Sequence, residues 1–340
     1  MRMKRLSALV MAGLGALSVS SAVAVSAPAD AAIKAKFMQS VTLPDDMIPW
    51  PLRFGGISGI DNVGGGNFVL ISDGSGDVGP ARYYQLHLPF LREGILGGPV
   101  GPLQLTGGGT VLGPGNMPLA PGQFDLEGIR KRGGDLVVSS EGAHPFIRII
   151  RPPGLFVRDL PLPVAYRPGR KTGLQVNAGL EGLAVSPNGT ISTLTEGPLQ
   201  QDPAGGSRLL QFVGKGTAEY VYRTDPGYGA SELLAINNTD FLVLERSYDA
   251  KTRRNGVKIY WTTTNGGARI TGATSGATRA LPKNLIYDVG ALPNLVPDNV
   301  EGMTWGPNIN KNKRTLVLVS DDNFNHPAQH TKIHILSVAF

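Results

Sequence analysis

The sequence predicts an all-β fold, a single β-propeller of five four-stranded blades. An acidic residue followed by a short apolar run recurs in the stretches DLEGI, GLEGLA, SELLAI and NVEGMTW, which begin at Asp125, Gly179, Ser231 and Asn299. Each of them leads to an apolar strand that ends at a second acidic residue. Gly (46) and Pro (26) are abundant and charged residues make up 17% of the chain. This mixture is typical of many turns and few long helices.

The repeat is marked by one position in each unit. A variant unit, GISGIDN, precedes the other four and carries Ser58 at this position. The first set of repeat residues is Ser58, Glu127, Glu181, Glu232 and Glu301. Successive members are 69, 54, 51 and 69 residues apart. Units of this length with four short strands each are typical of propeller blades.

The second strands of the units are NFVLISDG, DLVVSSEG, TISTLTEG, DFLVLERS and TLVLVSDD. They end at the second set of acidic residues, which is Asp73, Glu141, Glu196, Glu245, and Asp321 or Asp322. A third strand begins near a basic residue in each unit, as in RYYQLHL and TKIHIL, and most units continue to a fourth apolar stretch, such as AEYVYRT. The Asn-Gly pair within Ser186–Thr190 predicts a type I′ hairpin turn between strands.

The last unit ends one strand short, at TKIHILSVAF. The spare strand AKFMQSVTL (Ala35–Leu43) can complete this blade and close the ring, which removes exposed sheet edges. Six blades remain an alternative if one of the 69-residue intervals holds a further blade. A pair of β-sandwiches is the other alternative.

The N-terminus predicts export. Arg2, Lys4 and Arg5 precede the apolar and small-residue stretch Leu6–Val25, and small residues then allow cleavage after Ala31. We therefore expect a signal peptide at residues 1–31, a secreted propeller domain at residues 32–340, and no membrane span after cleavage. An uncleaved membrane anchor is the alternative.

Cleavage after Ala31 removes three positive charges and one negative charge, so the formal net charge falls from +6 to +4. The basic residues are scattered rather than clustered, which argues against nucleic acid as a partner. Cysteine is absent, so stability must come from packing, closure of the sheet or a bound metal. We expect a monomer that acts on a small-molecule substrate.

Equivalent positions of successive blades lie on a circle, so several carboxylates are expected to converge at the mouth of a central channel. Like charges at close range repel, and bound cations, basic neighbours or protonation relieve the repulsion. A hard divalent cation, Ca²⁺ above all, binds oxygen ligands in irregular geometry. The predicted metal ligands are Asp73, Glu127, Glu141, Glu181, Glu196, Glu245, Glu301, Asp321, Asp322 and Asn323. Alternatively, these acidic residues form ion pairs and backbone hydrogen bonds between blades.

Five further residues are candidates for catalysis. Arg53, Arg82 and Arg246 are expected to hold an anionic substrate, since Arg binds phosphate with two hydrogen bonds. His144 and His326 follow acidic strand ends, and either is a candidate general acid or base because imidazole titrates near neutral pH. Alternatively, both His residues are solvent-exposed loop residues without a catalytic role. The chain has no G-x-S-x-G or H-E-x-x-H motif and no P-loop.

In their order along the chain, these motifs resemble the esterase-like, phytase-like family of exported bacterial propellers. The resemblance runs from about Leu52 to Phe340, and its most specific motifs are Leu244–Ser247 and Asp321–Phe324. It implies metal-dependent hydrolysis of ester or phosphoester bonds and assigns no catalytic residue. A non-catalytic cell-surface propeller that binds a glycan, polymer or protein, and a lactonase-like metal enzyme, are alternative interpretations.

Overall fold

The computed structural model describes residues 33–45, 47, 53–74, 78–90, 103–271, 274–291 and 298–340. The predicted signal peptide, residues 1–31, lies outside the described residues. All the strands described below belong to one compact unit, Ile33–Phe340. Within the described ranges, no helix has both the length and the apolar character needed to cross a bilayer.

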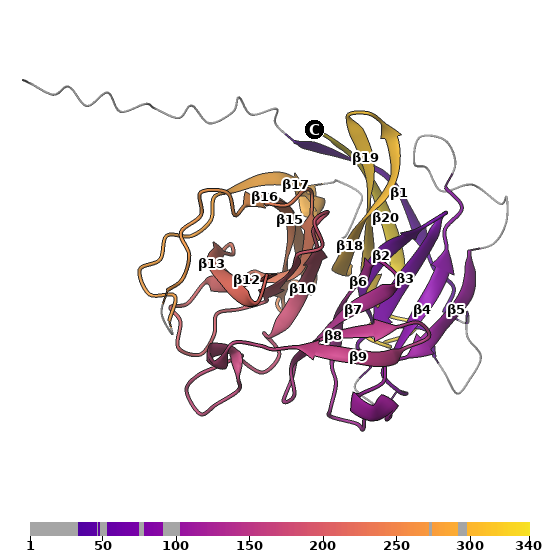
Figure 1. Ribbon diagram of the computed structural model, residues 1–340. Helices are drawn as coiled ribbons and strands as arrows, with labels where there is room; N and C mark the ends of the chain where they lie inside the picture. The colour runs from indigo at the N-terminus through magenta and orange to yellow at the C-terminus, as the bar shows by residue number, and fades with distance from the viewer. Residues whose placement is uncertain are drawn as a thin grey trace, which may run out of the picture. The chain divides into compact units, whose positions relative to one another are not determined.

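The described residues form twenty strands in five four-stranded antiparallel sheets, which confirms the five-bladed propeller (Figure 1). Blade 1 consists of β2 (Ile57–Gly64), β3 (Asn67–Ser72), β4 (Arg82–His87) and β5 (Gln104–Thr110). Blade 2 consists of β6 (Leu126–Arg132), β7 (Asp135–Ser140), β8 (Phe146–Arg151) and β9 (Leu155–Leu160). Blade 3 consists of β10 (Leu180–Val185), β11 (Ile191–Thr195), β12 (Gly206–Val213) and β13 (Gly216–Arg223).

Blade 4 consists of β14 (Gly229–Ala235), β15 (Asp240–Asp249), β16 (Arg254–Thr263) and β17 (Lys283–Asp288). Blade 5 consists of β18 (Asn299–Asn310), β19 (Lys313–Asp321), β20 (Lys332–Ala339) and β1 (Lys34–Thr42). The helical elements described are three short 3-10 helices, η2 (Pro114–Asn116), η3 (Val164–Tyr166) and η4 (Val289–Ala291).

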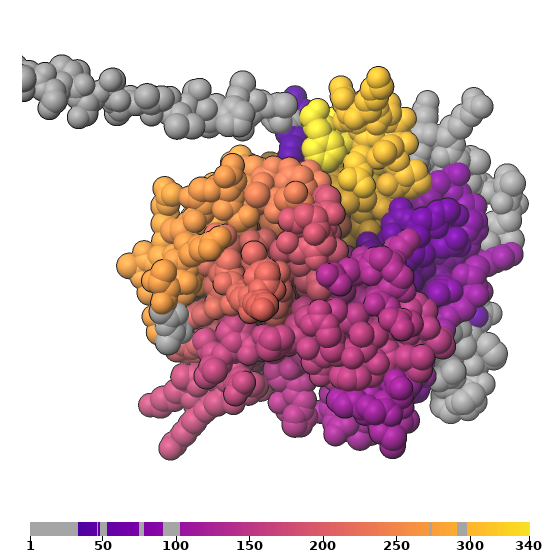
Figure 2. Space-filling view, viewed as in Figure 1, coloured from indigo at the N-terminus to yellow at the C-terminus, as the bar shows by residue number. Residues whose placement is uncertain are grey.

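The N-terminal strand closes the ring as the sequence predicted. β1 pairs antiparallel with β20, from Lys34 opposite Ala339 to Thr42 opposite Lys332. The edge of blade 5 is thereby covered by a strand far away in the sequence. In Figure 2 the indigo start of β1 lies beside the yellow C-terminal end of the chain, with which it pairs.

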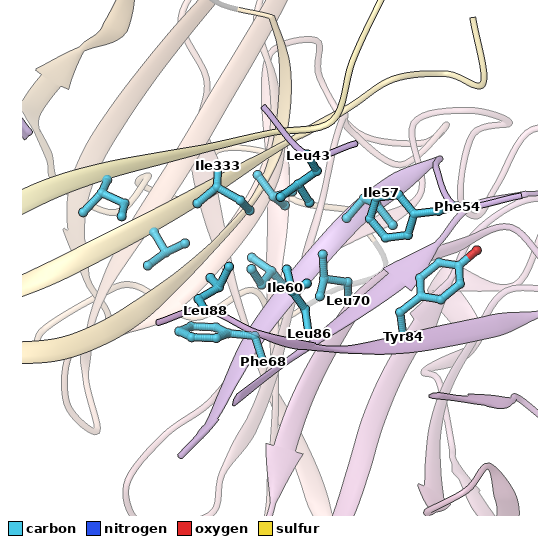
Figure 3. Close-up of a cluster of buried hydrophobic side chains, with 13 residues drawn as sticks. Leu43, Phe54, Ile57, Ile60, Phe68, Leu70, Tyr84, Leu86, Leu88 and Ile333 are labelled. Atoms are coloured by element: carbon cyan, nitrogen blue, oxygen red, sulfur yellow. The ribbon is translucent and has the colours of Figure 1, made fainter. Parts of the chain in front are cut away.

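The hydrophobic core is divided into five clusters, and each cluster fills the space between two neighbouring blades. In the cluster between blades 5 and 1, Val317 and Ile333 pack against Ile60 and Leu70, and Leu43 joins them from the segment after β1 (Figure 3). The other four clusters join blades 1 and 2, 2 and 3, 3 and 4, and 4 and 5. Alternating apolar residues on both faces of each sheet supply this burial.

The hairpin at Ser186–Thr190 is present but is not the predicted type I′ turn. Such a turn needs positive φ at both central residues, and here Gly189 has a φ of 82° while Asn188 is not among the residues with positive φ. The Gly189 N–H donates to the Ser186 carbonyl, so Pro187 and Asn188 are the central residues. Pro187 prefers this place because its ring fixes φ near −65°.

Candidate functional site

The innermost strand of each blade carries a β-bulge near its start. The register shifts between Ile57 and Gly59 in β2, and equivalent shifts occur in β6, β10, β14 and β18. A bulge places two residues opposite one and re-aims a side chain. The bulge residues, which we call the inner ring, are Ser58, Glu127, Glu181, Ser231 and Glu301.

This register corrects one member of the first predicted set. In blade 4 the bulge residue is Ser231, and Glu232 occupies the next position, where the other blades carry glycine. Glycine at this position lets neighbouring inner strands approach closely: a Cβ at Gly182 would lie 2.8 Å from the backbone nitrogen of Leu233. The acidic residue in SELLAI therefore does not belong to the inner ring.

A second group of side chains follows the second strand of each blade. These residues pair with the residue that precedes or begins each inner strand, as Glu141 does with Asp125 and Glu196 with Gly179. We call this group the outer ring. Its members are Asp73, Glu141, Glu196, Arg246 and Asp321.

The prediction that Glu245 belongs to this ring is wrong by one residue. Glu245 pairs with Ala230 and takes the place of the Ser or Thr found in the other blades, and Arg246 takes the ring position. Glu245 is fully buried, accepts hydrogen bonds from the Tyr222 hydroxyl and the Asp225 N–H, and lies 2.7 Å from Lys283 Nζ. A shift of one residue along a strand turns the side chain to the other face of the sheet.

The two rings and Asp125 together form what we call the acidic cluster. It contains eight carboxylic residues, namely Asp73, Asp125, Glu127, Glu141, Glu181, Glu196, Glu301 and Asp321. Arg246 provides a positive charge within the cluster: its Nη2 lies 3.3 Å from Glu301 Oε1 and 3.8 Å from Glu196 Oε1. Arg246 Nη1 also donates a hydrogen bond to Asn299 Oδ1 at 2.8 Å.

Burial and mutual repulsion make the charged forms of these carboxyl groups unfavourable. Burial, assisted by nearby carboxylates, raises the pKa of Asp73, Asp125, Glu127, Glu141, Glu181, Glu196 and Asp321. The pKa reaches about 7 for both Asp73 and Glu141. One Arg cannot neutralise such a set, so at neutral pH the cluster requires protons or bound cations.

Three of the carboxylates have the spacing of a cation site. Oxygen atoms of Asp125, Glu127 and Glu141 lie within 4.8 Å of one another. Ser58 and Ser231, at the inner-ring positions without a carboxylate, are buried, and their hydroxyl oxygens have no hydrogen-bond partner among the described residues. An all-oxygen donor set with irregular geometry fits Ca²⁺ rather than a softer ion.

The axis of the ring is closed beside the acidic cluster by a buried ion pair. Arg130 Nη2 lies 2.7 Å from Glu232 Oε2, and both side chains are almost fully buried. The Arg130 guanidinium also donates to the carbonyl oxygens of Ile60, Leu233 and Met303, which belong to blades 1, 4 and 5. A ligand of the acidic cluster must therefore approach from the end of the ring at which the inner strands begin.

Arg53 and Arg82 lie near the cluster but are used for packing. Both guanidinium groups lie over the Phe324 ring, at 5.8 Å and 5.6 Å from its centroid. Arg82 is buried and donates to the Tyr84 hydroxyl and the Arg53 carbonyl. Its charge lowers the pKa of Asp73, although burial outweighs this effect. The predicted role of these two residues in substrate binding stays a prediction.

The remaining predicted residues lie outside the two rings. Asp322 accepts hydrogen bonds from the Gly56 and Phe324 N–H groups, and the exposed Asn323 donates its N–H to Asp321. His144 is exposed in the loop after Glu141. His326 lies between Asp45 and Asp322. Asp125 and Asn299 were not predicted from the sequence, although each is the first residue of its repeated stretch.

A polar groove of about 880 Å³ adjoins Arg246. Arg246 and Arg253 provide two guanidinium groups, Asn299 and Asn323 provide amides, and Lys332 lies 2.9 Å from Asp298. Tyr248 contributes an exposed ring. This groove connects the basic member of the outer ring to solvent, and its chemistry suits an anionic ligand.

Known proteins that are similar to this chain include solved structures and one protein family. Similar solved structures include an endo-arabinase from Bacteroides thetaiotaomicron VPI-5482 (TM-score 0.46, 10% identity, 85% of this chain and 95% of that chain covered). They also include RS223 β-xylosidase (TM-score 0.44, 10% identity, coverage 83% and 92%). At this level of similarity neither structure bears on the substrate. No curated protein matches the chain.

The family model described as phytase-like, esterase-like activity of phytase, matches residues 52–324. This range includes four complete blades and the strands β18 and β19 of the fifth, and it contains both rings of the acidic cluster. The chain therefore belongs to the phytase-like family.

Proposed function

We propose that the protein is an exported hydrolase of ester or phosphoester bonds whose acidic cluster uses a bound divalent cation, Ca²⁺. The observation that carries the proposal is an acidic cluster of eight carboxylic residues and one Arg beside a closed axis, with three of the carboxylates at cation-binding spacing. Membership of the phytase-like family supports the reaction class.

Asp125, Glu127 and Glu141 are the residues that would hold the ion. A bound Ca²⁺ supplies positive charge that polarises a carbonyl or phosphoryl oxygen and acidifies a bound water. Glu141 is held in place because its Oε2 accepts a hydrogen bond from the Gly179 N–H of the next blade at 2.7 Å. Glu127 is fixed by the bulge of β6, between inner strands that pack closely.

Arg246 and the groove beside it are placed to bind the substrate. The side chain is oriented by Asn299 and by the carboxylates of Glu196 and Glu301, so little conformational freedom is lost on binding. Arg253 adds a second guanidinium to the groove, whereas Lys332 is paired with Asp298. An anionic ester bound here presents its reacting group toward the acidic cluster.

Asp73 is the candidate general base. Its Oδ1 is buried and makes no hydrogen bond within the part of the chain that the structure describes. Burial and the charges of Glu301 and Asp125 raise its pKa to about 7. A carboxyl group with this pKa is partly ionised at neutral pH and can accept a proton from water during attack.

The test uses the chain without residues 1–31, stripped of metal. Hydrolysis of p-nitrophenyl phosphate, bis(p-nitrophenyl) phosphate, p-nitrophenyl acetate and phytate is measured with Ca²⁺ and with chelator. We expect Ca²⁺-dependent turnover of at least one ester, and a lower melting temperature in chelator. Calcium-dependent melting without turnover of any ester would indicate a binding propeller. No effect of Ca²⁺ on either quantity would refute the cation site.

A further inference from the structure

A second group of potential metal ligands lies outside the acidic cluster. Asp45 belongs to the segment after the closing strand β1, and His326 and His330 belong to the segment between β19 and β20. Asp45 Oδ1 lies 3.2 Å from His326 Nδ1 and 3.1 Å from His330 Nδ1. The three ligand atoms lie within 4.8 Å of one another. The fold thus brings together residues separated by up to 285 positions in the sequence.

The spacing of these atoms matches the coordination shell of a small transition-metal ion. Zinc binds imidazole nitrogen and carboxylate oxygen at about 2.0–2.2 Å, almost always in tetrahedral geometry, which puts neighbouring ligand atoms about 3.3 Å apart. The two oxygen–nitrogen distances, 3.1 Å and 3.2 Å, are close to this value. A bound ion would replace the hydrogen bond that joins His330 Nδ1 to the Asp45 carboxylate.

The His326 ring provides an independent observation. Both ring nitrogens are inaccessible to solvent, and neither forms a hydrogen bond of good geometry among the described residues. Buried polar atoms without partners are uncommon in proteins. Nδ1 lies close to Asp45 yet off the direction of a hydrogen bond to it. A metal ion between the two groups would satisfy that nitrogen.

The other nitrogen of His326 lies against a carboxylate. Asp322 Oδ2 is 3.1 Å from His326 Nε2, and the Asp322 side chain is almost fully buried. Asp322 is held by the N–H groups of Gly56 and Phe324 and by the Thr331 hydroxyl. A carboxylate on the far side of a metal-binding imidazole orients the ring and increases its basicity.

We propose that Asp45, His326 and His330 form a binding site for a divalent transition-metal ion of the Zn²⁺ class. Two imidazoles and one carboxylate favour Zn²⁺ over Ca²⁺, which takes oxygen ligands. The fourth coordination position is left to water or another small ligand. The site is separate from the acidic cluster, and its occupancy does not depend on the proposed hydrolase activity.

A metal at this site would tie the closing strand to the last blade. Asp45 follows β1 by three residues. Both His residues lie in the connection between β19 and β20, and β20 is the strand with which β1 pairs. Ligands that bind only the folded chain stabilise it in proportion to the logarithm of their concentration. We expect saturating Zn²⁺ to raise the melting temperature by roughly 5 °C.

The experiment titrates Co²⁺, as a spectroscopic probe, into metal-free protein that carries no His tag. We expect one equivalent of Co²⁺ to give the intense visible absorption of a four-coordinate site. Zn²⁺ should abolish this absorption, and a tenfold excess of Ca²⁺ should leave it unchanged. The absence of such absorption up to millimolar Co²⁺, together with no change in melting temperature with Zn²⁺, would overturn the proposal.

Variants then assign the site. His326→Gln and His330→Gln should each weaken Co²⁺ binding at least tenfold, and Asp322→Asn about tenfold. His87→Gln is the matched control, because His87 contacts Asn67 at the opposite end of its blade. Glu141→Gln should leave the Co²⁺ spectrum intact, which separates this site from the acidic cluster. Unchanged binding in both His326→Gln and His330→Gln would refute the assignment.

A direct measurement remains decisive if a variant fails to fold. Crystals of the unaltered protein soaked in Zn²⁺ should show anomalous scattering between Asp45, His326 and His330. Anomalous density that appears only at other positions would contradict the proposal.

Discussion

The Arg246 guanidinium lies 3.3 Å from the Glu301 carboxylate, at a position of the outer ring where the other four blades carry Asp or Glu. The substitution of one basic residue into a ring of acidic ones breaks the fivefold repeat of charge. The positive charge lies on one side of the acidic cluster, and the polar groove that could admit an anion lies on the same side. The five blades are therefore alike in backbone structure but differ in the charge that they contribute to the outer ring.

Arg246 is predicted to bind the anionic part of the substrate. Arg246→Gln should raise KM for a phosphoester about tenfold or more, since a hydrogen bond to a charged group contributes about 1.5–3 kcal/mol. The effect on p-nitrophenyl acetate should be much smaller, because that substrate carries no charge. Steady-state kinetics on both esters measure the difference, and equal losses on both would contradict a role in charge recognition. The KM of Arg246→Lys for the phosphoester should lie between those of the unaltered enzyme and Arg246→Gln.

Glu141 and Glu245 are predicted to respond in opposite ways to the same substitution. Glu141→Gln removes a carboxylate whose pKa burial raises to about 7, so at pH 8 in chelator it should stabilise the fold by up to about 3 kcal/mol. It should also weaken Ca²⁺ binding at least tenfold. Glu245→Gln breaks the pair with Lys283 and should destabilise the fold by about 2–4 kcal/mol.

Urea unfolding and calcium titration of both variants provide the measurements. Because Glu245 lies outside the acidic cluster, its variant serves as the control for calcium affinity. Loss of calcium binding in Glu245→Gln, with normal affinity in Glu141→Gln, would show that the register-based assignment of the rings is wrong.

Without cations, the fold should lose stability as the pH rises from about 4.5 through about 7. The acidic cluster has carboxyl groups with raised pKa, to about 7 for Asp73 and Glu141, so in this range the native state binds more protons than the unfolded state. Calcium should therefore raise the melting temperature more at pH 8 than at pH 5. Melting curves in chelator and in Ca²⁺ across this range test the sign, and a metal-free protein that gains stability toward pH 8 would contradict it.

Asp73 is predicted to act in proton transfer rather than in binding the cation. Asp73→Asn should lower kcat by about 10²-fold or more, the contribution typical of a general base. Calcium affinity should change little, because the proposed ligands are Asp125, Glu127 and Glu141. A calcium titration and a pH profile of kcat/KM separate the two roles. The acidic limb of the profile should be lost in the variant.

Replacement of only one residue of the axial pair, Arg130 and Glu232, is predicted to lower the free energy of unfolding. Arg130→Leu leaves Glu232 buried without its partner and should destabilise the fold by about 3–5 kcal/mol. Leu and Gly occur at the equivalent positions of other blades, at Leu234 and Gly182. The double variant Arg130→Leu, Glu232→Gly should therefore recover part of the loss. Additive losses in the double variant, measured by urea unfolding, would argue against this coupling.

Much of the architecture could be predicted from the sequence because the repeat is read from local patterns. Alternating apolar residues bounded by Gly and Asn turns mark each strand, and five similar units mark five blades. The missing strand in the last unit and the spare strand near the N-terminus together predicted the closure of the ring, which β1 and β20 confirm. Asp73, Glu141 and Glu196 were placed correctly at strand ends for the same reason.

The sequence by itself determined the five blades, the closing strand and the gathering of acidic residues, since these follow from strand periodicity and the order of the repeats. The tertiary structure decided which residues face the axis. Because of the bulge in β14, Ser231 rather than Glu232 belongs to the inner ring. Because Gly229 pairs with Arg246, Arg246 rather than Glu245 belongs to the outer ring. A shift of one residue turns a side chain to the opposite face of a strand, and only the paired neighbour fixes that register.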